Sequence, residues 1–406
     1  MIDINLIRED IEKVKAGVAK KGYDLSIVAR AQELDVKRRE LIEEVEGLRA
    51  KRNEFAKEQD HEGGKNVKEK LRRLEPDLAK VEKDLEEVMS AIPNLPWDNV
   101  PEGEGEGDNI EVRKWGDAGK SGKDHLEIGT ALDLIDFEAG AKVAGSQFYF
   151  LKNEAVLLEQ ALLLFGMEIL IEKGFKLIST PDLAKSRYYL GTGYQPKGKE
   201  AQIYEIEGQD LGLIATAEVT MAGYHADEVI MKKDLPLRYA AVSHCFRQEG
   251  GAYGKYSKGL YRVHQFTKLE MFIYSLPEKS EEMHQEILGI EEEILQKLGI
   301  PYRVLEMCTG DLGAIAAKKY DLEAWMPGRD DYGEVTSTSN TTDYQARNLN
   351  IKYREGDHNE YPHLLNGTAI AISRTLITLL ENYQNEDGSV TVPEVLRKWV
   401  GKEVIK

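Results

Sequence analysis

The chain has 406 residues with 72 Asp or Glu and 54 Lys or Arg, and its formal net charge of −18 argues against general adhesion to nucleic acid, although one element can still present a basic patch. Two cysteines, Cys245 and Cys308, exclude a disulfide framework and a zinc quartet, so we expect no zinc and a reducing compartment. The charged N-terminus and the lack of any apolar run of about 18 residues predict a cytoplasmic protein with neither signal peptide nor membrane span.

Residues 1–97 predict an N-terminal domain with a long helical arm. Apolar residues recur every seven positions from Leu34, and a second series from Val67 alternates steps of four and three, which is the spacing of a coiled coil. The segment 61–65 interrupts this pattern, and its two glycines predict the turn at the tip. We expect an antiparallel hairpin over about 27–92, with helices over about 27–59 and 66–91.

Basic side chains gather near the predicted tip of this arm. Interleaved glutamates are typical of a solvated coiled-coil face, whereas a grip on RNA phosphates needs only cations at a suitable pitch. The arm alone leaves both interpretations open. The side chains that would contact RNA are Lys51, Arg52, Lys65, Arg72 and Arg73.

A boundary follows at residues 93–122, where three prolines and alternating Gly and Glu are typical of a connection, and we place the linker at 98–122. From 123 to 406 the pattern predicts an α+β domain with a mainly antiparallel sheet flanked by helices. The chain contains no phosphate-binding loop of the P-loop or dinucleotide type, so an ATP site would need another architecture. Expected helices cover 151–171, 278–298 and 368–383, and expected strands cover 175–181, 203–207, 211–220, 303–307 and 332–338.

The segment from Cys245 to Glu270 has the densest chemistry of the chain. Arg247 and Glu249 precede a glycine-rich loop, and further cations and carboxylates follow it. The stretches on both sides of this loop are rich in residues that favour β-strands. This segment resembles motif 2 of the class II aminoacyl-tRNA synthetases in its seryl-tRNA synthetase form. Further resemblances follow in order: KRNEFAKE (51–58), ATAE (215–218), CTGDLGAIAAKKYDLEAWMP (308–327), GEVTSTSNTTDYQAR (333–347) and NGTAIAISRTL (366–376).

The resemblance covers nearly the whole chain and implies a ligase reaction. It implies ATP-dependent activation of L-serine to seryl-adenylate and transfer of the seryl group to the 3′ end of tRNA(Ser), and of tRNA(Sec) where that is present. It also implies Mg²⁺ and a homodimer built through the motif 1 helix at 153–174. Such catalysis needs positioning and charge neutralisation rather than a nucleophilic triad.

The resemblance assigns site residues one by one. Arg247 would bridge the substrate carboxylate and the α-phosphate, and Arg374 would face the γ-phosphate, where planar guanidinium groups fit. Arg374 has independent support, because a lone arginine in an apolar helix is costly unless it is paired. The implied serine contacts are Thr216, Ala217, Glu218, Arg247, Glu270 and Thr368. The implied ATP contacts are Arg247, Gln248, Glu249, Val263, Phe266, Glu334, Val335, Thr336, Ser337 and Arg374, with Glu334 and Ser337 as Mg²⁺ ligands.

Some positions depart from the commonest pattern of the family. Lys255 and Tyr256 replace a frequent Arg-Asp in the motif 2 loop, where Lys255 would contact tRNA. Thr368 replaces a frequent serine, and its extra methyl would tighten the serine pocket. His264 is expected to be a structural hydrogen-bonding residue rather than an acid or base.

Two alternative functions stay open. An amino-acid activating enzyme that loads a carrier protein would not need the long arm. A coiled-coil scaffold with an inactive domain would not need Arg247, Glu249, Glu270, Glu334 and Arg374 together.

Overall fold

The computed structural model describes residues 1–194, 202–249 and 259–406, which divide into two compact units, Met1–Leu95 and Pro96–Lys406. Lys255, to which the sequence assigns a tRNA contact, lies outside the described residues, as does Tyr256. Across the described residues, no helix combines the length and the apolar character needed to cross a bilayer.

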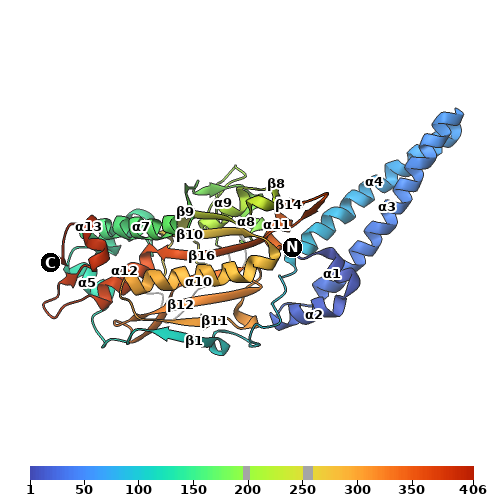
Figure 1. The fold of residues 1–406 in the computed structure, drawn as a ribbon. Helices are drawn as coiled ribbons and strands as arrows, with labels where there is room; N and C mark the ends of the chain where they lie inside the picture. Colours follow the sequence, from blue (N-terminus) through green and yellow to red (C-terminus); the bar gives the residue numbers. More distant parts are fainter. Residues whose placement is uncertain (195–201, 250–258) are drawn as a thin grey trace. The chain divides into compact units, whose positions relative to one another are not determined.

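The unit Met1–Leu95 is helical, and its two long helices form an antiparallel hairpin (Figure 1). Its helices are α1 (Ile4–Glu9), α2 (Ile11–Lys20), α3 (Ser26–Glu58) and α4 (His61–Ala91). A narrow apolar seam that includes Val45, Val67 and Leu71 joins α3 to α4, as a coiled coil requires. At the other end Arg8 donates to the buried carboxylate of Asp35 at 2.6 and 2.8 Å, which attaches α1 to α3. The predicted helical arm is confirmed.

The turn at the tip of the arm lies at Gln59 and Asp60, so the prediction that the two glycines form it is wrong. Gln59 has a left-handed φ of 58° and ends α3. The Asp60 side chain then accepts hydrogen bonds from two backbone N–H groups in the first turn of α4. An N-cap carboxylate satisfies donors that would otherwise lack partners, and this stabilises a helix start that includes Gly63 and Gly64.

The unit Pro96–Lys406 is built on an eight-stranded sheet with the order β1-β11-β12-β13-β16-β10-β9-β4. Among the described residues, β4 pairs in parallel with β9 and the other pairings in this sheet are antiparallel. The predicted α+β fold with a mainly antiparallel sheet is therefore confirmed. The strands are β1 (Ile110–Trp115), β4 (Lys176–Ser179), β9 (Leu237–Phe246), β10 (Gln265–Ser275), β11 (Tyr302–Glu306), β12 (Lys318–Met326), β13 (Asp331–Asn340) and β16 (His363–Ala371).

Three helices pack on this sheet and form the main core with it: α7 (Glu154–Glu172), α10 (Ser280–Lys297) and α12 (Ile372–Asn382). Figure 1 shows α10 lying over the sheet, roughly along the direction of β16 and β12, and the buried side chains Leu162, Ile287 and Leu376 belong to one cluster from these three helices. Smaller helices are α5 (His125–Ala131), α6 (Phe137–Ala144), α8 (Ser186–Gly191), α9 (Ala217–Gly223), α11 (Tyr344–Asn348) and α13 (Arg397–Val400). Short strands are β2 (Ile135–Asp136), β3 (Phe150–Leu151), β5 (Leu183–Ala184), β6 (Tyr204–Glu205), β7 (Gly212–Leu213), β8 (Val229–Met231), β14 (Lys352–Glu355), β15 (His358–Glu360), β17 (Val390–Thr391) and β18 (Val404–Ile405).

Part of the predicted linker 98–122 belongs to the sheet. Strand β1 lies at its edge and pairs with β11, and Trp115 stacks on Tyr302 with ring centroids 5.9 Å apart. The glycine- and glutamate-rich composition before Ile110 hides this short strand, because a strand that is exposed along its whole length shows no alternation of apolar and polar residues.

Two further predictions misplace the boundary between strand and helix. Residues 217–220 begin helix α9 rather than ending a strand, because the Thr216 side chain accepts a hydrogen bond from the Glu218 N–H and caps the helix. Residues 368–371 end strand β16 rather than beginning a helix, and α12 starts at Ile372. This second correction matters for the site, because β16 pairs Thr368 directly with Glu270 in β10.

Candidate active site

A polar cavity of about 390 Å³ lies where β10, β13, β16, the end of β9 and the start of α12 come together. Cations and carboxylates line it side by side, so a ligand inside it meets both signs of charge. The charged and aromatic side chains in its lining are Tyr194, Glu218, Arg247, Glu249, Tyr261, Arg262, Phe266, Lys268, Glu270, Lys319, Glu334 and Arg374. Such a lining suits a zwitterion together with a polyphosphate.

A β-bulge in β13 decides which of its residues face the cavity. The register with β12 shifts between Glu334 and Thr336, which leaves Val335 as the extra residue. In a regular strand Glu334 and Ser337 would point to opposite faces, because successive side chains alternate. The extra residue brings both to the cavity side, while the Thr336 hydroxyl points away and bonds to α10.

Strand β16 contains a second bulge. Its register with β10 shifts between Thr368 and Ile370, so Ala369 is the extra residue. Thr368 lines the cavity across from Glu270, and the neighbouring Gly367 faces α10, where a Cβ would collide with side chains. Two bulges in adjacent strands thus shape the floor of the cavity.

Glu334 and Arg374 form an ion pair across one end of the cavity. Their Oε1 and Nη1 atoms lie 2.8 Å apart, and the Arg374 guanidinium lies 4.9 Å from the centre of the Tyr261 ring. Burial would raise the pKa of Glu334, but Arg374, Lys319 and Arg247 outweigh it and lower that pKa to about 2. Glu334 is therefore a carboxylate throughout the neutral range.

A second charged cluster lies around Glu270 on β10. Lys268, two residues earlier on the same face, forms an ion pair with the Glu270 carboxylate and approaches the Thr368 hydroxyl at 3.4 Å. The Thr216 hydroxyl also donates a hydrogen bond to Glu270, with Oγ1 3.1 Å from Oε2. All four side chains are buried, so this cluster offers a small, dry set of donors and acceptors.

Glu218 is buried beside this cluster and receives three hydrogen bonds. Tyr194 donates to Oε2 at 2.9 Å, and Gln345 and Asn366 donate to Oε1 at 2.7 and 2.9 Å. Burial raises the pKa of Glu218, and the hydrogen bond from Gln345 acts in the opposite direction. The three donors come from distant parts of the chain, and sequence reasoning missed them all.

Arg247 follows β9 and reaches the cavity beside Phe266. Its guanidinium lies 5.2 Å from the centre of the Phe266 ring, and its Nε donates to the Ala215 carbonyl at 3.3 Å. His264 Nδ1 contacts the Arg247 carbonyl at 2.8 Å, which is the structural role that the sequence predicts for that histidine. Next to it, Arg262 pairs with Glu249 at 2.9 Å.

Three of the residues predicted to bind serine or ATP do not line the cavity. Thr216 and Ala217 are buried at the start of α9, and Thr216 acts on the cavity only through Glu270. Gln248 points away and donates from Nε2 to the Ile203 carbonyl at 2.6 Å. The predicted residues that do line it are Glu218, Arg247, Glu249, Val263, Phe266, Glu270, Glu334, Val335, Thr336, Ser337, Thr368 and Arg374.

Several other residues of the lining were not among the predicted site residues. Tyr261 and Arg262 follow the glycine-rich loop, and Lys319 lies on β12 beside Asp321, with Nζ 3.2 Å from Oδ1. Burial raises the pKa of Asp321 to about 7, more than Lys319 lowers it. Charged residues on a strand that otherwise packs in the core were the available signal, because such residues need partners.

The residues predicted as metal ligands present oxygen atoms on one face. Glu334 has 37% of its side chain exposed, and Ser337 lines the cavity two positions beyond the bulge. A carboxylate and a hydroxyl are ligands that Mg²⁺ accepts, since it takes one or two protein oxygens and completes its shell with phosphates and water. Within the described ranges, no three His, Cys, Asp or Glu side chains gather in a metal-binding arrangement.

Five of the residues predicted to contact tRNA lie in the unit Met1–Leu95, whereas the sixth, Lys255, is outside the described residues. Lys51 and Arg52 are on α3, and Lys65, Arg72 and Arg73 are on α4, all with exposed side chains near the tip of the arm. Arg73 forms an ion pair with Glu69 at 3.1 Å.

Both units match known families. Residues 1–96 match the family described as Seryl-tRNA synthetase N-terminal domain, and residues 202–383 match tRNA synthetase class II core domain (G, H, P, S and T). The chain is 54% identical over 420 residues to the serine–tRNA ligase of Rubrobacter xylanophilus, covering 100% of this chain and 99% of that protein. It is 52% identical over 425 residues to the serine–tRNA ligase of Dictyoglomus turgidum, with 100% and 99% covered.

Solved structures are similar over the same length. The seryl-tRNA synthetase of Pyrococcus horikoshii, complexed with ATP, has a TM-score of 0.93 at 41% identity, and the match covers 100% of this chain and 99% of that one. The cytoplasmic serine–tRNA ligase of Naegleria fowleri, in complex with AMP, has a TM-score of 0.90 at 35% identity, again with 100% and 99% covered.

Proposed function

This chain belongs to the seryl-tRNA synthetase family, and we propose that it activates L-serine with ATP to seryl-adenylate and transfers the seryl group to the 3′ end of tRNA(Ser), and of tRNA(Sec) where present. The observation that supports this most directly is that one cavity contains both a buried polar cluster and two arginines. The cluster consists of Lys268, Glu270 and Thr368, and the arginines are Arg247 and Arg374.

Adenylate formation needs the serine carboxylate held in line with the α-phosphate, and it needs the developing negative charge neutralised. Arg247 lines the same cavity as the Glu270 cluster and lies 5.2 Å from the centre of the Phe266 ring, and its planar fork binds both the carboxylate and the α-phosphate. Arg374 neutralises the far phosphates, and Phe266 and Glu249 bind the adenine. No protein group forms a covalent bond in this scheme.

The Glu270 cluster distinguishes serine from other small amino acids. Glu270 accepts from the serine ammonium and hydroxyl, while Thr368 lies across the strand pair as a second hydroxyl contact. A site that hydrogen-bonds a hydroxyl rejects alanine strongly, because its buried polar groups would lose their partner. The amino acid threonine is too large for the serine site, and the Thr368 methyl group reduces the space in that site further.

Glu334 and Ser337 would hold Mg²⁺ together with the ATP phosphates. When bound, the ion would supply neutralisation of the negative charge on the ATP phosphates. Glu334 is suited to this because it stays ionised, with a pKa of about 2. The remaining assignments are that Lys51, Arg52, Lys65, Arg72 and Arg73 contact tRNA phosphates and that Lys255 contacts its acceptor end. This activity would belong to the cytoplasm.

We further infer a homodimer, formed by the apolar face of α7 and the neighbouring β4. Val156, Leu157, Leu164 and Ile171 on α7 and Leu177 on β4 are between 41% and 56% exposed, which is unusual for apolar side chains gathered on adjacent elements. Light scattering on the purified protein measures its mass directly. A monomer of 45.8 kDa at micromolar concentration would contradict this inference.

Serine-dependent exchange of pyrophosphate into ATP tests the first half of the reaction, with alanine and threonine as competitors. We expect exchange with serine and little with either competitor; absence of serine exchange would refute the proposal and favour a non-catalytic scaffold. Charging of tRNA(Ser) transcripts tests the second half. Exchange without tRNA charging would instead favour an enzyme that loads a carrier protein.

A further inference from the structure

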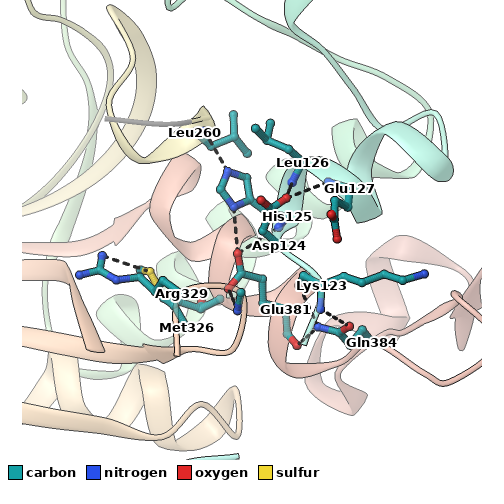
Figure 2. Close-up of polar contacts among 12 residues, drawn as sticks. Lys123, Asp124, His125, Leu126, Glu127, Leu260, Met326, Arg329, Glu381 and Gln384 are labelled. Atoms are coloured by element: carbon teal, nitrogen blue, oxygen red, sulfur yellow. Dashed lines mark hydrogen bonds and ion pairs between the residues drawn. The ribbon is translucent and has the colours of Figure 1, made fainter. Parts of the chain in front are cut away.

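A buried histidine and glutamate form a hydrogen-bonded pair (Figure 2), and the backbone that the histidine contacts leads directly to Tyr261 in the lining of the active-site cavity. His125, at the start of α5, has Nδ1 2.9 Å from Glu381 Oε1, and its backbone N–H donates to the same oxygen at 3.0 Å. Glu381 lies near the end of α12, and its other oxygen accepts from the Gly328 N–H at 2.9 Å. Neither side chain is part of the described lining of the cavity.

The second ring nitrogen of His125 binds the backbone that enters the site. The Leu260 N–H donates to His125 Nε2 at 3.2 Å, so Nε2 must be the unprotonated nitrogen and Nδ1 must hold the proton that Glu381 accepts. Leu260 is fully buried, and a Cβ on Gly259 would overlap His125 Nε2. Gly259 also has a left-handed φ of 64°, so this approach of backbone to imidazole requires glycine.

The residue after Leu260 is Tyr261, whose ring is close to two guanidinium groups. The Arg374 guanidinium is 4.9 Å and that of Arg329 is 5.3 Å from the ring centre. Arg329 directly follows Gly328, which is held by Glu381, and Arg374 lies two turns before Glu381 on α12. The pair therefore contacts all three segments that supply Tyr261, Arg329 and Arg374.

We propose that His125 and Glu381 are positioning residues for the ATP end of the cavity. They hold the backbone at Leu260 and Gly328 so that the Tyr261 ring keeps its contacts with both Arg374 and Arg329. The Glu270 cluster that receives the amino acid shares no hydrogen bond with this pair among the described residues. The identification of the ligand as ATP rests on the proposed function, whereas the positioning of Tyr261 does not.

The test compares two substitutions of His125 that introduce side-chain amides of different length. His125→Gln can place its amide oxygen near the position of Nε2 and accept from the Leu260 N–H, whereas His125→Asn is too short to do so. In serine-dependent exchange we expect His125→Asn to raise the KM for ATP about tenfold, as loss of a partner for one buried donor implies. The KM for serine should stay unchanged, and His125→Gln should recover most of the loss.

A matched control is His225, a histidine whose two ring nitrogens also form polar contacts, one of them with a glutamate. Its Nδ1 lies 2.7 Å from Glu228 and its Nε2 lies 2.9 Å from the Tyr239 hydroxyl, and these three residues are outside the described lining of the cavity. His225→Asn should leave both KM values as in the wild type. Thermal unfolding of each variant shows whether it is folded at the assay temperature.

Three results would overturn the proposal: an equal rise of both KM values, no change in either, or His125→Gln impaired as much as His125→Asn. Direct titration of ATP onto each protein in a calorimeter gives a second reading that needs no catalysis. A wild-type protein that binds ATP but shows no exchange with serine would refute the proposed function, while the ratio of ATP dissociation constants would still decide the positioning role.

Discussion

The Glu334 carboxylate lies 2.8 Å from the Arg374 guanidinium, and a one-residue bulge at Val335 puts this carboxylate on the cavity side of β13. The two residues come from different elements, a strand and the helix α12. Their contact keeps an arginine in a largely apolar helix paired, and it lowers the pKa of a carboxylate that burial alone would raise. This ion pair therefore prepares one end of the cavity for phosphates.

Removing the charge of Glu334 should impair adenylate formation. For Glu334→Gln we expect serine-dependent exchange to fall by about 100-fold or more, because a preorganised charge at the phosphates is lost. Glu323→Gln is the matched control, since Glu323 lies opposite Glu334 on β12 but pairs with Arg303. Because the pKa of Glu334 is lowered to about 2, its carboxylate is present above that pH and is lost only below it. An acid limb of the wild-type rate near pH 5 that disappears in Glu334→Gln would contradict this assignment.

The hydroxyl of Thr368 should contribute to selection of serine over alanine. Its Oγ1 lies 3.4 Å from Lys268 Nζ, and Thr368 pairs with Glu270 across the strands. Thr368→Val keeps the shape and removes the hydroxyl, so we expect the ratio of kcat/KM for serine to that for alanine to fall about tenfold. Thr368→Ser retains the hydroxyl and should preserve the ratio. Equal ratios in Thr368→Val and the wild type would show that this hydroxyl takes no part in selection.

The sequence predicts those parts of the molecule in which a local pattern matches the local structure. The arm follows this rule, since the apolar spacing from Val67 onward is the seam that joins α3 to α4. Its tip does not, because the Asp60 cap outweighs the signal of two adjacent glycines. From sequence alone it is difficult to judge whether one capping side chain or two adjacent glycines will determine where the turn lies.

The cavity shows a second reason for the limits of prediction. Glu334 and Ser337 are three residues apart, which regular alternation would place on opposite faces, and only the bulge joins them. The Glu218 partners Tyr194 and Gln345 have no sequence pattern in common with Glu218, because a hydrogen bond between distant segments leaves no periodic signal. A buried carboxylate indicates that donors exist, but not which ones.

The arm should be needed for tRNA charging but not for serine activation. Deleting residues 30–90 should leave serine-dependent exchange largely intact, because no described residue of the cavity belongs to that unit, and should abolish charging of tRNA(Ser). Reversing charge at the tip is a milder test: Lys51→Glu with Arg72→Glu should raise the KM for tRNA and weaken its salt dependence. Lys80→Glu, an exposed position elsewhere on α4, is the control. Equal loss of exchange and charging on deletion would refute this separation of roles.

Glu291 should make the stability of the fold depend on pH. It lies on α10 and is fully buried, and the Thr336 hydroxyl donates to its Oε2 at 3.3 Å. Burial raises the pKa of Glu291 well above its ordinary value of 4.5, more than the Thr336 hydrogen bond lowers it. A raised pKa means that the folded state holds this proton more tightly than the unfolded state. The stabilisation is therefore complete below pH 4.5 and is lost as pH rises toward the raised value.

The glutamine side chain in Glu291→Gln is uncharged at every pH, so this variant does not undergo the same loss of stability as pH rises. We therefore expect the Tm of Glu291→Gln, relative to that of the wild type, to be higher at pH 8 than at pH 5, as measured by calorimetry in matched ionic strength. Glu281→Gln, on the exposed side of the same helix, should show no such trend. If the difference in Tm between Glu291→Gln and the wild type were the same at both pH values, Glu291 would have to be ionised in the folded protein, with a partner for its charge inside the core.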